Sequence, residues 1–316
     1  LRKNNYLFVD GRYTLQAEKQ SGKFFKIKTI PQILPKTILR KKSLRIGYDP
    51  NLITRQFLNT FFNFTDCKLI PVQKNLIDLI WKRKNKSYKG KFYHLPDDAV
   101  GQNVFKKVSK LIFVMKKKRI DYQFITSSEN SAWLLNLRGY DSKYTPIPHC
   151  VVLVDKRKKI KLFCDLKNVS NLIRKKYKYV EFLDTSKLNF LLSNIKKKKF
   201  SIDKNTCSIS NEKIITLNNK IVNFVDPIDS FKAIKTKIEI QNIKRAHLYD
   251  GAALTRYLFW IKRNFKKKKI SEISGEKKLL KFRKENKDFK FLSFPTISGS
   301  GPNGAIIHYR ATKKTD

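Results

Sequence analysis

Near the end of the chain, a glycine-rich loop and the histidine that follows it could do chemistry. Gly299-Ser300-Gly301-Pro302-Asn303-Gly304 spells G-x-G-x-x-G, the pattern of dinucleotide-binding loops. Such a loop needs a helix that opens on its last glycines and an acid about 20 residues later. Here Pro302 and Asn303 predict a turn, β-branched residues follow, and only 12 residues remain after Gly304. We therefore reject a dinucleotide site and expect a β-loop-β unit that delivers His308 at the end of a strand.

The other histidines and the cysteines give weaker signals. Spacing alone fits His308 to an ordinary strand histidine as well as to a functional one. His247 falls on or beside the apolar stripe of a long helix and has no second ligand near it, so we expect a packed helix residue. The cysteines lack C-x-x-C spacing, which favours buried reduced thiols over a zinc site or a disulfide framework; they are Cys67, Cys150, Cys164 and Cys207.

The charge balance is extreme, yet it does not by itself predict nucleic-acid binding. The 316 residues include 70 Lys and Arg against 25 Asp and Glu, a net charge of +45. Of the basic residues 55 are Lys and 15 are Arg, whereas recognition of phosphates and base edges favours Arg. The lysine runs are dispersed and are typical of solvated faces; they span residues 116–118, 196–199 and 266–269. We expect no specific nucleic-acid partner, although a basic stripe on one face would reopen that possibility.

Composition also bounds the class of protein. With 41% hydrophobic residues, 23 Phe and 13 Tyr, the chain has enough apolar material for two or three folded domains. No apolar run approaches the ~18 residues of a membrane-spanning helix, and no leader-like segment opens the chain. The expectation is a cytoplasmic protein without a membrane partner.

Strands and helices alternate in the first part of the chain. An apolar strand over 6–9 ends at Asp10-Gly11 and precedes a helix over 12–20. The pattern continues with a strand over 44–48, a helix marked by Ile53, Phe57 and Phe61, a strand over 68–72 and a short helix over 76–81. Such alternation predicts an α/β domain around a largely parallel sheet.

A second α/β unit and a helical region follow. Residues 90–101 are expected to form a linker before a helix over 104–115. Strands are predicted over 122–126, 150–154, 160–163 and 200–202, with a hairpin turn at the basic residues 156–159 and a helix over 188–195. Thr236 and Glu239 fit a capping box that opens a long amphipathic helix ending at the lysine run, and a second helix is expected over 276–286.

The two α/β units share short sequence echoes. Residues 8–10 match 163–165, residues 46–51 match 200–205, and residues 69–72 match 221–224. The offsets of 155, 154 and 152 residues are nearly constant, which indicates a duplicated domain. Chance similarity between short apolar strands is the alternative, and different strand orders in the two units would remove the duplication hypothesis.

Several longer motifs follow one another along the chain: Asp10-Gly11-Arg12-Tyr13 with residues 15–20, residues 46–50 and 69–81, Ala132-Trp133-Leu134-Leu135-Asn136-Leu137-Arg138-Gly139, Lys244-Arg245-Ala246-His247, and residues 294–298 followed by 304–309. In sequence and in order they resemble a known family, the three-domain Xaa-Pro aminopeptidases (aminopeptidase P) with a pita-bread catalytic domain. The resemblance implies an α/β fold class. Two tandem creatinase-N-terminal-like domains, 1–95 and 96–229, would precede the start of an α+β pita-bread peptidase domain, 230–316.

The resemblance also implies a chemistry. The family removes an N-terminal residue that precedes proline, using two divalent metal ions, commonly manganese, held by two Asp, one His and two Glu. His308 matches the family histidine that contacts substrate near the scissile carbonyl. The family's metal ligands lie downstream of that motif, so no metal ligand or cofactor site is expected in this chain, and both ends are expected to be truncated. Arg310 stands where the family usually has a small residue, and the sequence offers no reason for it.

The implied partners are a peptide with proline in second position and, in the full-length protein, a second copy in a homodimer. The alternative from another class is a catalytically inactive family member that serves as an interaction scaffold. The sequence downstream of Asp316 distinguishes the two, because five ligands in order mean an enzyme.

Overall fold

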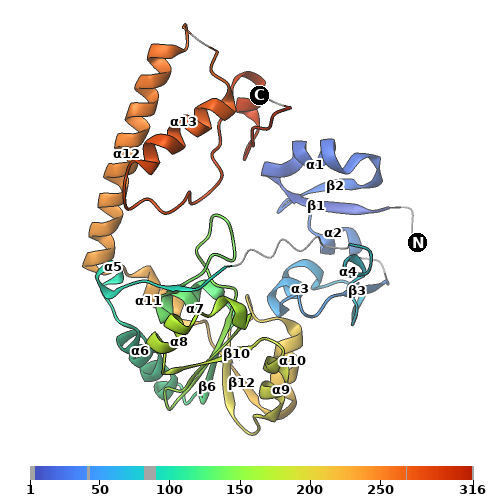
Figure 1. The fold of residues 1–316 in the computed structure, drawn as a ribbon. Coiled ribbons are helices and arrows are strands. Elements are labelled where there is room, and N and C mark those ends of the chain that lie inside the picture. Colours follow the sequence, from blue (N-terminus) through green and yellow to red (C-terminus); the bar gives the residue numbers. More distant parts are fainter. Residues whose placement is uncertain (1–3, 41–42, 82–89, 268, 315–316) are drawn as a thin grey trace. The chain divides into compact units, whose positions relative to one another are not determined.

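The computed structural model describes residues 4–40, 43–81, 90–267 and 269–314 (Figure 1). The chain divides into two compact units: residues 1–40 together with 241–316, and residues 41–240. No helix in the described ranges combines the length and the apolar composition of a membrane span.

A six-stranded mixed sheet forms the centre of the unit 41–240. Its spatial order is β10-β9-β8-β6-β11-β12, with β6 at Tyr122–Ile125, β8 at Val151–Asp155, β9 at Ile160–Cys164, β10 at Val180–Asp184, β11 at Lys199–Ile202 and β12 at Lys220–Asn223. β8 runs antiparallel to β6 and β9, and the other neighbouring pairs are parallel. The predicted basic hairpin turn joins β8 to β9, where Asp155 Oδ1 accepts hydrogen bonds from the amides of Arg157 and Lys159 at 2.7 and 3.0 Å.

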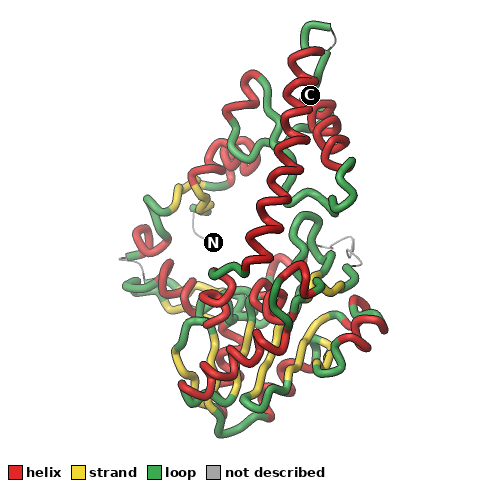
Figure 2. Tube along the Cα trace, turned by 90° about the vertical axis from the view of Figure 1, so that its left-hand side faces the viewer, coloured by secondary structure: helices red, strands yellow, loops and turns green. Residues whose placement is uncertain are grey.

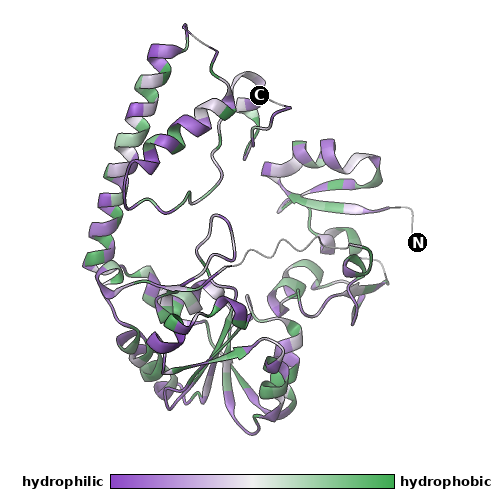
Figure 3. Ribbon diagram, viewed as in Figure 1, coloured by the Kyte–Doolittle hydropathy of each residue, from purple (hydrophilic) through white to green (hydrophobic). Residues whose placement is uncertain are grey.

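Helices cover both faces of this sheet, in keeping with inner strands that are mostly apolar, as the hydropathy colouring shows (Figure 3). On one face, α6 (Val104–Lys117), α7 (Ser128–Leu135), α8 (Asn171–Lys176) and α11 (Pro227–Ala233) pack on residues such as Val152 and Leu162. On the other face, α9 (Lys187–Asn194) and α10 (Ile209–Asn218) pack on Leu153, Phe163 and Phe200. The tube view shows the strands in yellow and the helices in red (Figure 2).

Two parallel strand pairs account for most of the first 81 residues. β1 (Tyr6–Asp10) pairs with β2 (Lys26–Ile30), and between them lie η1 (Gly11–Tyr13), α1 (Thr14–Ser21) and η2 (Gly22–Phe24). β3 (Arg45–Tyr48) pairs with β4 (Lys68–Pro71) around α3 (Arg55–Phe62). The short helices α2 (Pro35–Leu39) and α4 (Leu76–Ile80) complete this part.

The local connections of these pairs repeat in the six-stranded sheet. β9 and β10 are also parallel and also enclose a 3-10 turn, η3 (Leu166–Asn168), and a helix. The aspartate that ends each first strand caps the 3-10 turn in the same way: Asp10 Oδ1 accepts from Arg12 N and Asp165 Oδ1 from Lys167 N, both at 3.0 Å. Likewise Asp49 Oδ1 and Asp203 Oδ1 accept from the amide two residues later, both at 2.8 Å. These local matches favour duplication. The sheet arrangements differ, because the first copy has its pairs as separate two-stranded sheets and the second copy has them in one sheet, so the criterion of equal strand order is not met.

The two copies touch through equivalent loops within the unit 41–240. Gln56 N donates to Lys204 O at 3.3 Å, and Ser210 N donates to Pro50 O at 2.9 Å. Both donors and both acceptors are related by the offset of 154 residues found in the sequence, and Thr54 bridges Ser208 in the middle. A contact in which each copy uses the same groups on the other is isologous, as in a two-fold dimer.

Several sequence predictions needed correction in this part of the chain. The stretch predicted as a linker contains β5 (Tyr93–His94), which pairs with β7 (Leu137–Arg138), and the helical turn α5 (Asp97–Val100), because Phe92 and Val100 are buried there. β10 and α10 were not predicted. β10 was missed because charged residues interrupt its apolar pattern. Residues 82–89, which precede the stretch predicted as a linker, lie outside the described ranges.

The helical region agrees better with its prediction. Helix α12 (Lys237–Asn264) opens on the expected capping box, in which Thr236 N donates to Glu239 Oε2 at 2.7 Å and Glu239 N to Thr236 Oγ1 at 3.1 Å. α13 (Glu272–Lys284) begins four residues earlier than predicted, at a second capping box built by Ser271 and Ser274. The lysines at 116–118 and 196–199 are solvent-exposed as expected. His247 is also exposed, so the prediction of a packed histidine was wrong; its Nδ1 lies 2.9 Å from Ile243 O.

Candidate functional site: the loop that carries His308

His308 lies on the surface, in a turn just after η4 (Gly301–Ala305). Its backbone φ of 57° is in the left-handed region, which residues other than glycine adopt rarely and often at functional sites. The expected β-loop-β unit is absent, since residues 294–298 and 305–309 belong to no strand. A strand needs a hydrogen-bonding neighbour, and the described residues provide none here, so the backbone turns instead.

One buried carboxylate, that of Glu272 in the first turn of α13, holds the loop in place. Its Oε1 accepts a hydrogen bond from Ser300 N at 2.6 Å and another from Asn303 Nδ2 at 3.2 Å. Its Oε2 accepts from the hydroxyl of the buried Tyr309 at 2.6 Å. Negative charge in a first helical turn is also favoured by the helix dipole. Glu272 thus fastens the segments on both sides of η4, including the residue next to His308.

The glycines of the loop serve its backbone geometry. A Cβ on Gly299 would lie 2.9 Å from Asn303 O, and Gly301 has a φ of 54°. η4 carries Pro302 near its start and spans five residues of 3-10 helix, so no α-helix presents amide groups to a phosphate. This agrees with the rejection of a dinucleotide fingerprint on sequence context.

The first segment of the chain meets His308 inside the same compact unit. The hydroxyl of Tyr13, at the end of η1, lies 3.1 Å from His308 Nδ1, and the two rings meet edge to face with centroids 5.7 Å apart. The neighbouring Asp10 accepts two side-chain hydrogen bonds from Arg12, at 2.8 and 3.3 Å, which together with the Arg12 amide lower the pKa of Asp10. The charge of His308 adds a smaller effect of the same sign. A motif from the start of the chain is therefore part of the surroundings of His308.

Arg310, which the sequence alone does not explain, has a partner in the structure. Its Nη2 lies 4.0 Å from Glu276 Oε1 on α13. The unit also contains a hollow of about 600 Å³ between α12, α13 and residues 288–297, but His308 is not among its lining residues. The hollow is open, and the bidentate pair between Arg283 and Asp250, at 2.6 and 2.9 Å, occupies one side of it. We therefore base the candidate site on the loop and not on the hollow.

The described residues do not fit a metal centre. Over 4–40, 43–81, 90–267 and 269–314 no three His, Cys, Asp or Glu side chains lie close enough together to hold an ion. The buried carboxylate beside the His308 loop, that of Glu272, already accepts three hydrogen bonds from loop groups. No step of a mechanism can be assigned to a metal ion on these residues.

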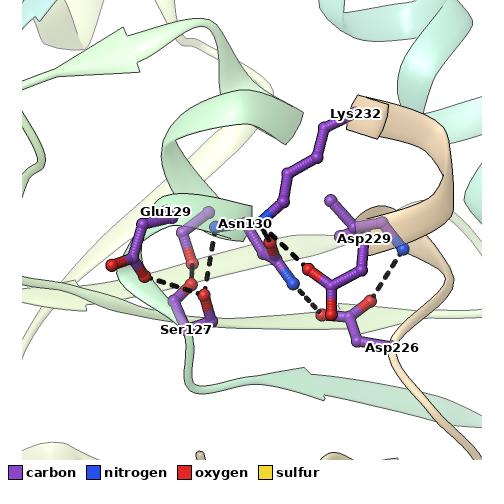
Figure 4. A network of polar contacts seen from close by, with 8 residues as sticks. Ser127, Glu129, Asn130, Asp226, Asp229 and Lys232 are labelled. Atoms are coloured by element: carbon purple, nitrogen blue, oxygen red, sulfur yellow. Dashed lines mark hydrogen bonds and ion pairs between the residues drawn. The ribbon is translucent and has the colours of Figure 1, made fainter. Parts of the chain in front are cut away.

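A second polar cluster lies at the carboxyl ends of parallel strands β6 and β12, where ligands often bind in α/β sheets (Figure 4). Asn130 Nδ2 donates to Asp226 Oδ2 at 2.8 Å, and Lys232 Nζ donates to Asn130 Oδ1 at 2.5 Å. Asp226 also caps α11 through Ile228 N, and burial raises its pKa. These groups satisfy one another and join α7 to α11, so we assign them a structural role.

Lys107 is a buried cation on the apolar face of α6. Its Nζ donates to Trp133 O at 2.9 Å and to Asn136 Oδ1 at 2.6 Å, and lies 4.1 Å from the centroid of the Trp133 ring. These groups belong to the C-terminal end of α7, where a cation is favourable. Burial lowers the pKa of Lys107 to about 8. The contacts identify a helix cap and not a catalytic lysine.

Comparisons with known proteins place the chain. The model of the creatinase/prolidase N-terminal domain matches residues 82–239, half of the chain, and that of metallopeptidase family M24 matches residues 241–315. The chain belongs to this metallopeptidase family. The resemblance to the three-domain Xaa-Pro aminopeptidases and the predicted fold class are thereby confirmed.

Individual relatives give the same result. A Laccaria bicolor protein named probable Xaa-Pro aminopeptidase P is 34% identical over 325 residues, which are 96% of this chain and 50% of the relative. Xaa-Pro aminopeptidase 1 of Dictyostelium discoideum is 31% identical over 337 residues, 99% of this chain and 53% of the relative. The crystal structure of a Caenorhabditis elegans X-prolyl aminopeptidase, described as a cytosolic enzyme with a di-nuclear active site, matches with a TM-score of 0.90 at 24% identity and covers 100% of this chain and 55% of its own. The chain spans about half the length of these relatives.

Two residues of the site were not identified as such in the sequence. Tyr13 was noticed only as part of a family motif, because nothing in its spacing indicates a contact with a residue 295 positions away. Glu272 follows a serine at a helix start, and that pattern signals a cap and not a carboxylate that fastens a loop.

Proposed function

We propose that this chain is the amino-terminal part of an Xaa-Pro aminopeptidase, which releases the first residue of peptides with proline in second position. The observation that carries the proposal is the match to proteins of that name along at least 96% of the chain. We propose the division 1–95, 96–229 and 230–316 for its three domains, the last being the start of the peptidase domain.

His308 is the residue of this chain to which we assign a substrate contact, near the scissile carbonyl. Its ring is exposed on a loop that Glu272 fastens, so the imidazole can be presented in one orientation. An imidazole N–H can donate to an amide oxygen and stabilise the negative charge that develops there. Such stabilisation of the amide oxygen is useful at an Xaa-Pro bond, because this bond is a tertiary amide whose nitrogen carries no proton.

Two divalent metal ions, manganese in our proposal, would activate the attacking water in the complete enzyme. The described residues do not provide a site for them. We therefore expect no peptidase activity from the 316-residue chain alone. Manganese-dependent cleavage of an Xaa-Pro peptide by this chain would refute that expectation.

The remaining parts of the proposal concern the surroundings of the enzyme. We also propose a cytoplasmic location, in line with the Caenorhabditis elegans enzyme that is described as cytosolic, and a homodimer that acts on peptides and has no specific nucleic-acid or membrane partner. Sedimentation of the complete protein would test the homodimer. Its elution from a polyanion column at low and moderate salt would test the absence of a specific nucleic-acid partner.

The function is tested with a polypeptide that continues through the complete peptidase domain. We expect it to cleave Xaa-Pro peptides when manganese is added, and His308→Ala to lower kcat by about a hundredfold or more, as for loss of one donor that stabilises an oxyanion, with unchanged metal content. A protein that binds no metal and cleaves no such peptide would instead be a scaffold. Unchanged turnover of His308→Ala would remove the residue from the mechanism.

A further inference from the structure

We propose that Tyr13 is a positioning residue for His308: its hydroxyl donates a hydrogen bond to Nδ1 and so holds the neutral ring with its proton on Nε2, the nitrogen left for the substrate carbonyl oxygen. The role of His308 in catalysis rests on the proposed function, whereas the hydrogen bond does not. Tyr13 acts through His308 and does not itself contact the substrate.

The contact between the two residues is specific in both distance and orientation. The Tyr13 oxygen lies 3.1 Å from His308 Nδ1, and the rings are inclined at 84° to each other. Tyr13 is half-buried at the end of η1, whereas His308 is exposed. The phenol therefore has more support from its surroundings than the imidazole, which is the arrangement in which the first group orients the second.

The backbone of His308 makes such support useful. Its φ of 57° aims the side chain away from the course of an extended chain. Glu272 fastens the loop through Ser300, Asn303 and Tyr309 but does not touch the imidazole. The ring is therefore held through Tyr13, while the backbone beside it is held through Glu272.

The direction of the hydrogen bond follows from the available groups. Across the described residues, Nδ1 of His308 is the one hydrogen-bond partner recorded for the Tyr13 hydroxyl, and Nε2 of His308 has none. A phenol is a stronger acid than a neutral imidazole, so the phenol proton points to Nδ1. Neutral imidazole carries one proton, which then lies on Nε2.

Two other histidines in the same chain provide internal references with the opposite tautomer. His247 Nδ1 lies 2.9 Å from Ile243 O, and a carbonyl can only accept, so this nitrogen carries the proton. His94 Nδ1 lies 2.7 Å from the hydroxyl of Tyr177, which itself donates to Leu135 O at 2.8 Å. The Tyr177 proton is thus engaged, and His94 Nδ1 must donate. A tyrosine next to a histidine therefore does opposite things at the two positions.

The test is ¹⁵N NMR of the imidazoles in the 316-residue chain above the pH at which histidines titrate, where no peptidase activity is needed. We expect the Nε2–H tautomer for His308 and the Nδ1–H tautomer for His94 and His247. Tyr13→Phe keeps the ring contact and removes only the hydroxyl, so the Nδ1 resonance of His308 should move to that of a free acceptor and no other histidine should change. Tyr6→Phe, on β1 in the same segment, is the matched control.

A proton on Nδ1 of His308, or a His308 spectrum that is identical in Tyr13→Phe, would overturn the hydrogen bond. The catalytic consequence is measured in the polypeptide with the complete peptidase domain. Loss of one hydrogen bond predicts about a two- to tenfold lower kcat with unchanged KM, and a wild-type kcat in Tyr13→Phe would overturn the positioning role. If the wild-type enzyme cleaves no Xaa-Pro peptide, the proposed function fails, and the NMR result still decides the contact.

Discussion

The loop that carries His308 should loosen when the carboxylate of Glu272 is removed. Glu272→Ala removes one acceptor from each of three donors: Ser300 N, Asn303 Nδ2 and the Tyr309 hydroxyl. Each hydrogen bond to a charged group contributes about 1.5–3 kcal/mol when the donor stays buried, and less when water replaces the acceptor. Only Tyr309 is fully buried, so we expect a loss of about 3 kcal/mol in the local stability of the loop.

Because the chain has two compact units, a single free energy of unfolding is not well defined, and a local measurement is better. Hydrogen exchange of the Ser300 amide reports the opening of this loop. A loss of about 3 kcal/mol corresponds to exchange that is more than a hundredfold faster. Glu272→Gln keeps one acceptor oxygen and should accelerate exchange by about tenfold, which corresponds to a loss of about 1.4 kcal/mol.

The matched control is Glu285→Gln, at the other end of the same helix. Glu285 forms an exposed ion pair with Arg256 at 2.5 Å, and exposed pairs contribute little. The Ser300 amide should therefore exchange at the wild-type rate in this variant. The reasoning is refuted if Glu272→Ala leaves the exchange of Ser300 within about threefold of the wild type, a change of less than about 0.7 kcal/mol.

Two further predictions concern the unit 41–240. Because burial lowers the pKa of Lys107 from 10.5 to about 8, the unfolded state binds more protons at this group between these values, so Lys107 contributes a gain in stability from pH 8 to pH 10.5. The buried thiols of Cys150, Cys164 and Cys207 contribute a loss over the same range, because burial raises their pKa. The Tm of the wild type should therefore rise relative to that of Lys107→Met between pH 8 and pH 10.5, and a Tm difference that stays constant with pH would contradict the assignment. Alkylation of the native chain should label Cys67 first, because the other three thiols are buried. Burial raises the pKa of Cys150 and brings those of Cys164 and Cys207 to about 12. Peptide mass spectrometry that finds Cys207 modified before unfolding would contradict this prediction, because it would show that this thiol is accessible.

Patterns with a short period were enough to predict most of the elements. Strands such as β8 are buried on both faces, so apolar residues follow one another along them without alternation. The start of α12 was predicted from Thr236 and Glu239, because a capping box is a contact between residues three positions apart. The buried position of Lys107 also follows from spacing, since it falls on the stripe of Val104, Val108 and Leu111.

The site itself could not be predicted in the same way. The conformation around His308 depends on Glu272, which is 36 positions away, and on Tyr13, which is 295 positions away. The apolar residues at 305–307 favour a strand locally. Hydrogen bonds to a distant carboxylate override this preference, and such bonds leave no periodic signal in the sequence.

The reciprocal loop contact around Thr54 and Ser208 bears on how this part of the chain arose. Gln56 reaches Lys204 by the same kind of bond with which Ser210 reaches Pro50, so the partners exchange roles. A self-complementary seam of this kind is what two free copies of one ancestral module would form about a rotation axis. Fusion of the two copies would then have kept this two-fold interface within a single polypeptide. Each copy would have been free to diverge in sequence at positions outside the interface.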